Sequence, residues 1–558
     1  MKRNLLLIAM LVLTTIASKA QISDYTMVEN ELLAFPTARG FGKYATGGRG
    51  GSVVEVTNLD DNGQGSLRWA LKEAAKTDSW DAQSATIVFR VSGIITLQSD
   101  IRAKVHNVTI AGQTAPGEGI LIRGAKLNFG GSNDLIIRNI RARLGVKDLE
   151  RKEGESDTDY KKRCFIAGGS IGIENARNII IDHCCFGWSG EENMTMYDNF
   201  FTTVQWCIVH EGLYDAGHAK GARSYGCQWG GAPATYHHNL LANNYNRTPR
   251  INGASNENQD RNVFLEYLNN VNFNWAKANS CYGGENEAGE YSSHECNFVG
   301  NFYKAGPARS ASNSNYFVEM SAARSGKTLT AASVWYLADN VMPGKDAATN
   351  DNWSAINNKT GFPIADMKVT EWRYPSEAYT RLEDSQIDDY DKYRTPVETA
   401  EQAYENVLAK VGTVNRDAVE KRVINDVTTG TPKYKDSGSQ KTGIIDKPAD
   451  AEGYQPYAEA TPYTDNDHDG MDDEWETANG FDPANAADRN NVVTAEGYTA
   501  LEVYLCHLMG EELSIITGVA NVNTNPNLNL NVEKVISDNQ LIIKKASKIY
   551  SAAGQQIK

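Results

Sequence analysis

The chain has 558 residues and a formal net charge of −15. Surplus negative charge disfavours a nucleic-acid partner, because phosphate backbones are bound by surplus lysine and arginine. The eight cysteines are too few for a disulfide scaffold, and no CxxC pair indicates a zinc site, so we expect them to be small buried side chains.

The N-terminal segment has the pattern of a secretory signal peptide. Met1-Lys2-Arg3 is positive, Leu5 to Ile16 is apolar, and Ser18-Lys19-Ala20 provides small residues for cleavage. No later stretch approaches the ~20 apolar residues of a transmembrane helix. We therefore predict an exported mature protein that begins near Gln21, without a transmembrane segment.

A rhythm of short strands begins near Ala85. Each run is β-branched or aromatic and is followed by Asn or Gly, and no long amphipathic helix separates the runs, which disfavours a doubly wound α/β sheet. The pattern predicts an all-β solenoid in which each turn buries its apolar face on its neighbours. The clearest runs are 86–91, 93–97, 107–112, 119–124, 134–140, 178–183, 203–208, 234–241, 263–268, 296–301 and 334–340.

Asparagine recurs just after these strands. Stacked side-chain amides could hydrogen-bond along the turns of a solenoid, or asparagine could simply be a common turn residue. The residues concerned are Asn139, Asn239, Asn269, Asn301 and Asn340.

A cationic island lies in the middle of this acidic chain. From Ala216 to Asn256 there is no Asp or Glu, whereas Lys220, Arg223, Arg247 and Arg250 all fall there. Such an island focuses the field on an anionic ligand, and the alternative is a set of ordinary solvated surface cations.

Several short segments carry a resemblance to a known family. They are Ala34-Phe35-Pro36, Gly47-Gly48-Arg49-Gly50-Gly51, Gly65-Ser66-Leu67-Arg68, Ile110-Ala111-Gly112-Gln113-Thr114-Ala115-Pro116-Gly117, Ile181-Asp182-His183, Trp188-Ser189-Gly190-Glu191-Glu192, His218-Ala219-Lys220-Gly221, His237-His238-Asn239-Leu240-Leu241 and Arg247-Thr248-Pro249-Arg250. In this order they resemble the pectate lyase family (polysaccharide lyase family 1), and we expect a secreted bacterial member. The resemblance implies a right-handed parallel β-helix that cleaves polygalacturonate or pectin by β-elimination, with Ca²⁺ bridging the substrate carboxylate.

The resemblance also implies roles for individual residues of the island. Arg247 matches the family's catalytic arginine, which removes the C5 proton of the sugar. Lys220 matches the lysine that binds the substrate carboxylate, and Arg250 and His218 are further candidates for substrate binding. Asn252 stands where the family often has another arginine.

The expected ligands of a catalytic calcium are only partly present. Glu192 matches the family's acidic position, with Glu191 beside it. The family usually has Asp where this chain has Gly168-Gly169-Ser170, and its next acid falls on Met196. The calcium would then be held by fewer protein groups plus substrate, or a cationic side chain would replace it.

Other residues of the matching segments are expected to be structural. Asp182, His183 and His238 are assigned hydrogen-bonded structural roles, and Trp188, Trp206 and Trp229 are expected to be wall or core aromatics. Trp229 has the alternative role of stacking on a sugar ring.

The composition changes after the solenoid. Thr399 to Val411 has the periodicity of an amphipathic helix, and Asp417 to Val427 is a second candidate. Further on, a 12-residue calcium-loop pattern places carboxylates at positions 1, 3, 5, 9 and 12 and glycine at 6, and we predict a structural calcium site there. Its ligands would be Asp465, Asp467, Asp469, Asp473 and Glu476.

The predicted organisation is a signal peptide (1–20), a β-helix (21–395), a helical segment with linker (396–455), a calcium-loop segment with a docking helix (456–514) and a tail (515–558). The tail is either part of a sorting module or disordered. We expect a monomer that acts on an anionic polysaccharide. The alternatives are a β-helix glycoside hydrolase of the polygalacturonase kind, which needs paired carboxylates, and a non-catalytic glycan-binding β-helix.

Overall fold

The computed structural model describes residues 32–74, 84–252, 263–287, 294–309, 311–375, 390–435, 438–516, 532–537, 540–545 and 548–551. The predicted signal peptide lies outside these residues. The chain divides into a compact unit, Met1–Ser514, and a second unit, Ile515–Lys558.

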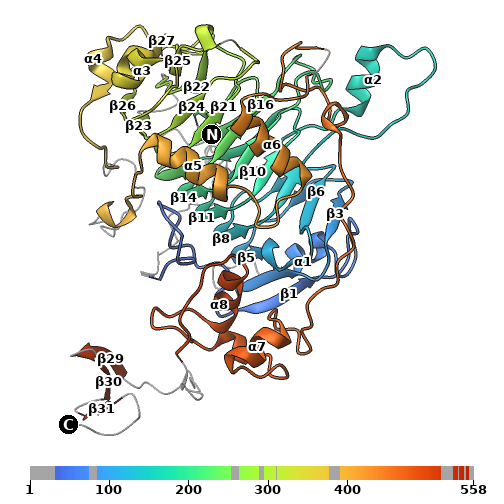
Figure 1. Cartoon of the computed structure of the whole chain (residues 1–558), viewed down its shortest axis with the longest axis vertical. Helices are drawn as coiled ribbons and strands as arrows, with labels where there is room; N and C mark the ends of the chain where they lie inside the picture. The colour runs from blue at the N-terminus through green and yellow to red at the C-terminus, as the bar shows by residue number, and fades with distance from the viewer. Residues whose placement is uncertain are drawn as a thin grey trace, which may run out of the picture. The chain divides into compact units, whose positions relative to one another are not determined.

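The first unit is built from three sheets whose strand pairings are all parallel (Figure 1). The 11-stranded sheet contains β1 (Ser52–Val56), β2 (Ala85–Phe89), β5 (His106–Ala111), β8 (Asn133–Arg138), β11 (Arg177–Asp182), β14 (Phe200–Gln205), β17 (Ala234–His237), β20 (Val263–Leu268), β23 (His294–Val299), β26 (Val334–Ala338) and β28 (Lys368–Val369). The 9-stranded sheet contains β4 (Ile101–Arg102), β7 (Leu127–Asn128), β10 (Ile171–Glu174), β13 (Glu192–Tyr197), β16 (Tyr225–Trp229), β19 (Arg250–Ile251), β22 (Asn279–Gly283), β25 (Tyr316–Met320) and β27 (Ile356–Asn358). The 8-stranded sheet contains β3 (Gly93–Thr96), β6 (Ile120–Arg123), β9 (Arg141–Arg143), β12 (Cys185–Gly187), β15 (Ile208–His210), β18 (Leu240–Ala242), β21 (Val271–Phe273) and β24 (Phe302–Lys304).

From β2 to β25, successive strands in the sequence go to successive sheets, so that each of these coils contributes one strand to each sheet. Strands β11, β12 and β13, for example, form one coil, and β14, β15 and β16 form the next. The result is a right-handed parallel β-helix, and the predicted fold class is confirmed.

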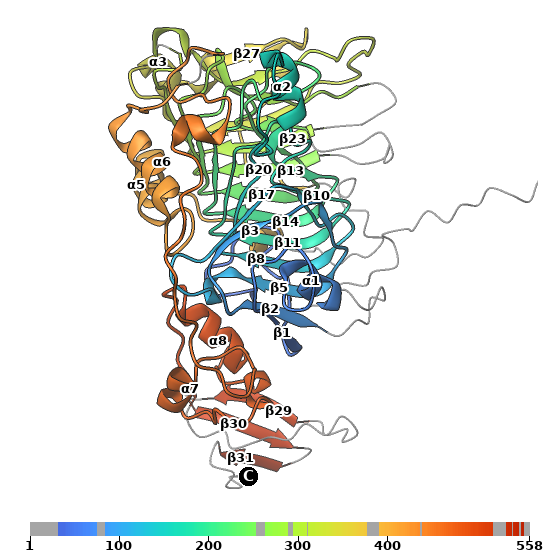
Figure 2. The ribbon, with the colours of Figure 1, turned by 90° about the vertical axis from the view of Figure 1, so that its right-hand side faces the viewer.

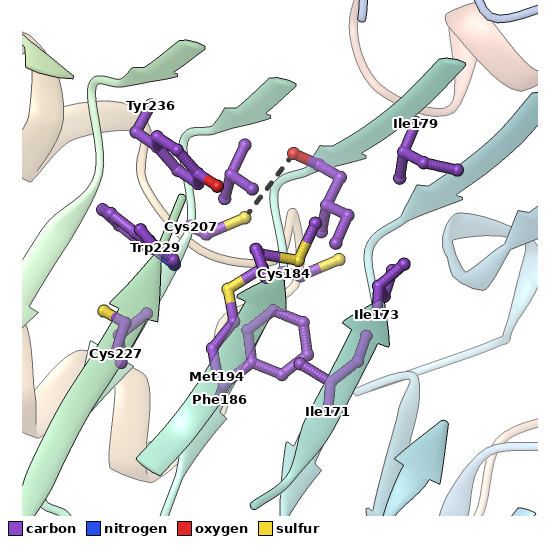
Figure 3. Close-up of a cluster of buried hydrophobic side chains, with 14 of the residues drawn as sticks. Ile171, Ile173, Ile179, Cys184, Phe186, Met194, Cys207, Cys227, Trp229 and Tyr236 are labelled. Atoms are coloured by element: carbon purple, nitrogen blue, oxygen red, sulfur yellow. Dashed lines mark hydrogen bonds between the residues drawn. The ribbon is translucent and has the colours of Figure 1, made fainter. Parts of the chain in front are cut away.

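The core runs along the inside of the coils. In the 9-stranded sheet, Ile171 pairs with Met194 and Met194 with Cys227, so that identical positions of successive coils stack on each other. Figure 3 shows these side chains pointing into the interior beside Cys184, Cys207 and the stacked rings of Trp229 and Tyr236. All eight cysteines are buried and free, as predicted.

Asparagines at one turn of the later coils form a ladder of hydrogen bonds from each coil to the next. The backbone N–H of Asn239 donates to Asn270 Oδ1 at 2.9 Å, and the pattern repeats from Asn270 to Asn301, Asn301 to Asn340 and Asn340 to Asn352. The predicted amide stack is therefore confirmed for Asn239, Asn301 and Asn340. It is wrong for Asn139 and Asn269, which adopt left-handed backbone conformations at φ 60° and 52° one position earlier in the turn.

The described part of the chain also contains short α-helices outside the three sheets. Their bounds are α1 (Leu67–Ala74), α2 (Asp157–Cys164), α3 (Asp346–Asn350), α4 (Ile364–Met367), α5 (Ala400–Lys410), α6 (Ala418–Thr429), α7 (Asp473–Asn479) and α8 (Ala500–His507). In the described part of the chain, none of them has the length and apolar character needed to cross a bilayer.

The two predicted helices after the solenoid form α5 and α6, which lie side by side along the coils (Figure 2). Each begins with a capping box, at Thr399 and at Asp417. Their valines pack against Leu240 and Val271 on the outer face of the 8-stranded sheet. A buried ion pair of 2.6 Å between Arg143 and Asp417 also ties α6 to β9.

Helices α7 and α8 lie near β1, at the first coils of the β-helix (Figure 2). Arg90, just after β2, donates to Asp465 Oδ2 at 3.0 Å and to the Tyr463 carbonyl oxygen at 2.7 Å. The second unit contains the antiparallel strands β29 (Val532–Ser537), β30 (Gln540–Lys545) and β31 (Lys548–Ser551).

Candidate active site

The cationic island lies on the outer face of the 9-stranded sheet. The register of β13, β16, β19 and β22 pairs Thr195 with Gln228, Gln228 with Arg250, and Arg250 with Tyr282. Because alternate residues of a strand point to the same side, these four side chains form a row on the outside while Met196, Trp229 and Ile251 face the core. The sequence could not show this row, since its members come from different coils.

Arg247 lies in the turn before β19, next to this row. Its guanidinium forms an ion pair with Glu192, donates to Gln228 Oε1 at 3.2 Å and lies over the Tyr225 ring at 4.3 Å. Its backbone has φ 57°, a left-handed conformation that is unfavourable for a large side chain and that recurs at functional sites.

The environment of Arg247 lowers the pKa of its guanidinium. Burial is the largest cause and the positive charge of Arg250 adds to it, whereas Tyr282 and Glu285 oppose both effects. The side chain nevertheless remains 17% exposed, so that a ligand on the outer face can reach it.

The other predicted substrate-binding residues flank Arg247 on two sides. Arg250 pairs with Glu285 at 3.2 Å and packs over the ring of Tyr282. On the other side, Lys220 is exposed, and its backbone N–H donates to His218 Nδ1 at 2.9 Å.

Tyr225 connects Arg247 with Arg223 and His218. Its hydroxyl accepts from Arg223 Nη1 at 3.0 Å, and Arg223 Nη2 is 3.3 Å from His218 Nδ1, while Arg247 covers its ring. Tyr225, Tyr282 and Glu285 were not identified from the sequence. The spacing of the strands along the chain was too irregular to align them with the island.

The residues expected to hold a catalytic calcium do not form a cation site. Glu191 pairs with His218 Nε2 at 2.9 Å, and Glu192 pairs with Arg247. The hydroxyl of Ser170 is buried and donates to the Gly187 carbonyl oxygen at 2.9 Å. Met196 faces the core. Ca²⁺ requires six to eight oxygen ligands, so the donor set of the described residues does not fit a protein-held calcium here.

The C-terminal acidic loop is different. Ligand oxygens of Asp465, Asp467 and Asp469 converge within 4.8 Å of one another, and so do those of Asp469, Glu476 and Asp488. Both carboxylate oxygens of Asp467 and of Glu476, together with one oxygen each of Asp469 and Asp488, are buried without a hydrogen-bond partner. Burial and the neighbouring carboxylates raise the pKa of Asp469 to about 7 and that of Glu476 to about 8. Unpaired buried carboxylates in this arrangement fit a hard divalent cation.

One predicted ligand of this loop is not among the convergent carboxylates. Asp473 accepts instead from the backbone and side-chain nitrogens of Asn466. Asp488, twelve residues beyond Glu476, enters the cluster instead. The loop pattern could not reveal Asp488, because it lies outside the 12-residue repeat.

The residues predicted to be structural lie at another turn of the coils. Asp182 is fully buried and accepts from Arg138 and Gln205 at 2.8 Å. Its burial opposes ionisation, but His183 and Arg138 outweigh burial and lower the pKa of Asp182. His183 and His238 stack on Trp206, and all three rings line a groove beside Lys410. Burial lowers the pKa of His238 to about 4.

The tryptophans divide between the core and this groove. Trp188 and Trp229 are completely buried, which confirms the predicted core role. It also excludes the alternative that Trp229 stacks on a sugar.

The fold and site together define a class: a right-handed parallel β-helix with a cation-lined outer sheet face. No protein-family model matches the chain. A "Probable pectate lyase C" of Emericella nidulans is 30% identical over 490 residues, which cover 86% of this chain and 94% of that protein. The chain therefore belongs to the pectate lyase family.

Two further similarities are more distant. A "Pectate trisaccharide-lyase" of Thermotoga maritima is 28% identical over 258 residues, 44% of this chain and 59% of that protein. The crystal structure of jun a 1, the major allergen from cedar pollen, has a TM-score of 0.42 and 16% identity over 68% of this chain and 93% of that chain. The bacterial type is not confirmed, because relatives matched over most of the chain are fungal.

Proposed function

We propose that this chain cleaves polygalacturonate or pectin by β-elimination, with Arg247 as the base. The observation that carries the proposal is the position of Arg247: a largely buried guanidinium with a lowered pKa, at the edge of an outward row that also contains Arg250 and Tyr282. Its relationship to proteins named pectate lyases supports the same chemistry.

The chemistry needs a neutral guanidine, although the ordinary pKa of arginine is above ~12. Burial and the charge of Arg250 act in the required direction. Arg247 takes the proton from C5 of the sugar, the electrons of that C–H bond form the C4–C5 double bond, and the C4–O bond breaks. The leaving oxygen takes a proton from solvent. Lys220 and Arg250 bind uronate carboxylates on either side of the reacting bond.

Further properties complete the proposal. The acidic loop of Asp465, Asp467, Asp469, Glu476 and Asp488 binds a structural Ca²⁺, for which its unpaired buried carboxylate oxygens are the support. The protein is exported after removal of its first 20 residues, for which its N-terminal pattern is the support, and it acts as a monomer.

The test follows the ultraviolet absorbance of unsaturated product from polygalacturonate, with reducing ends counted in parallel, for wild type and Arg247→Ala. We expect absorbance from wild type and a loss of about a hundredfold to ten-thousandfold in Arg247→Ala, because positioned proton transfer contributes about 10²–10⁴-fold. Lys104→Ala, which removes an exposed lysine outside the cationic island, serves as the control.

The two alternatives give different results in the same assay. Reducing ends without absorbance would indicate hydrolysis. Binding of polygalacturonate without either signal would indicate a glycan-binding protein without turnover. Either result would contradict the lyase proposal.

A further inference from the structure

The site of the missing calcium ligands is covered by a lysine. The Cδ atom of Lys126 lies 3.4 Å from where a Cβ on Gly168 would stand, and a Cβ on Gly172 would overlap the Lys126 ammonium. Gly172 belongs to β10 and pairs with Thr195 of the outward row. The lysine side chain therefore runs across the outer face of β10, over glycines that leave room for it.

The charge of this lysine is not neutralised by its surroundings. Among the residues that the structure describes, no carboxylate forms an ion pair with the Lys126 ammonium, whereas Glu191 and Glu192 are held by His218 and Arg247. Only the backbone N–H of Lys126 is tied to an acid, Asp100, at 3.2 Å. The ammonium is half-buried and is available to an anion on the sheet face.

The Lys126 ammonium lies on the same sheet face as Arg247, where it can bind a second carboxylate of the substrate. Gly172 pairs with Thr195 and Thr195 with Gln228, the residue that holds Arg247. Two strand spacings, about 9–10 Å, therefore separate β10, over which the lysine side chain lies, from β16, which carries Gln228. An acidic polymer that lies across the strands can present carboxylates to both groups.

We propose that the ammonium of Lys126 takes the place of a divalent cation on this sheet face: it binds a uronate carboxylate, so that substrate binding requires no calcium there. This inference rests on the proposed function for its substrate, and it explains why the aspartates expected near Gly168 are absent. Carboxylates there would bind the ammonium themselves and remove it from the substrate.

The test measures binding of an oligogalacturonate by titration calorimetry, in a calcium chelator and in calcium. We expect wild type to bind equally, within about twofold, in both buffers. In chelator, Lys126→Ala should bind at least about tenfold more weakly, and Lys126→Arg should stay within about threefold of wild type. Lys104→Ala is the matched control, because Lys104 is an exposed lysine that lies beside Gly131 instead, and it should bind as wild type does.

Thermal unfolding is recorded in the same buffers. It shows whether the chelator destabilises the protein by removing a cation from the acidic loop, so that this effect is not mistaken for a loss of substrate binding. Wild-type binding that disappears in chelator while the protein stays folded, or equal binding by Lys126→Ala and wild type, would overturn the inference. Absence of wild-type binding in both buffers would overturn it as well.

Binding and turnover also separate the two proposals. Retained calcium-independent binding that depends on Lys126, with no unsaturated product, would leave this inference standing while the lyase function fails.

Discussion

The guanidinium of Arg247 forms an ion pair with the carboxylate of Glu192. This contact joins the turn before β19 to the first residue of β13, two coils away in the sequence. It gives Glu192 a partner within the protein, and it makes Glu192 a positioning residue for the proposed base.

Glu192→Gln tests that role. Loss of the anion should lower the pKa of Arg247 further, because a nearby carboxylate favours the charged guanidinium. The rate rises with pH as the base loses its proton, so the rising limb of the pH–rate profile should move to lower pH, with kcat/KM at the optimum within about tenfold of wild type. A loss of more than a hundredfold that added calcium restores would instead make Glu192 a calcium ligand.

The acidic loop offers a matched pair of substitutions. Asp488→Asn removes a buried carboxylate of the cluster, whereas Asp473→Asn removes one that points to Asn466. Calcium should raise the thermal midpoint of wild type and of Asp473→Asn, and it should leave Asp488→Asn nearly unchanged. The measurement is differential scanning calorimetry with and without chelator. The reverse outcome would favour the ligand set that the 12-residue pattern predicts.

The asparagine ladder should carry part of the stability of the β-helix. Asn270 accepts from the Asn239 N–H and donates to the Tyr236 carbonyl oxygen at 2.9 Å, in a fully buried position. Asn270→Ala leaves these groups unpaired and should cost about 2–4 kcal/mol, since each unpaired buried group costs ~1–3 kcal/mol. Denaturant midpoints would measure the loss. Asn62→Ala, at an exposed turn, is the control, and an equal effect there would contradict the argument.

A buried glutamate should make stability depend on pH. Burial raises the pKa of Glu266 to about 8, and its Oε2 accepts from Thr235 at 2.9 Å. The folded state keeps this proton when the unfolded state has lost it, so stability should fall as pH rises from about 4.5 to about 8.

Glu266→Gln removes this dependence because its amide cannot ionise. At one pKa unit per ~1.4 kcal/mol, wild type should lose up to a few kcal/mol relative to the variant between pH 5 and pH 8. Unfolding midpoints at the two pH values would measure it, with the exposed Glu405→Gln as control. Parallel pH curves for wild type and Glu266→Gln would show that Glu266 is ionised in the folded protein.

Much of the fold could be predicted from local pattern. The strand runs, the helices α5 and α6 and the burial of the cysteines all depend on neighbouring residues, and the structure confirms them. The amide ladder was only partly predicted. Asn269 and Asn270 are adjacent in sequence, yet only Asn270 turns its side chain into the stack.

The candidate site was also only partly predictable from the sequence. The sequence by itself determined that cations gather between Ala216 and Asn256, and that a run of carboxylates lies between Asp465 and Glu476, because both are matters of composition and spacing. Only the tertiary structure decided the partners of these groups. It brought Glu192 to Arg247, Lys126 over Gly172 and Asp488 into the acidic cluster. The physical reason is that a β-helix aligns residues by coil, so groups tens of residues apart become neighbours at one strand spacing.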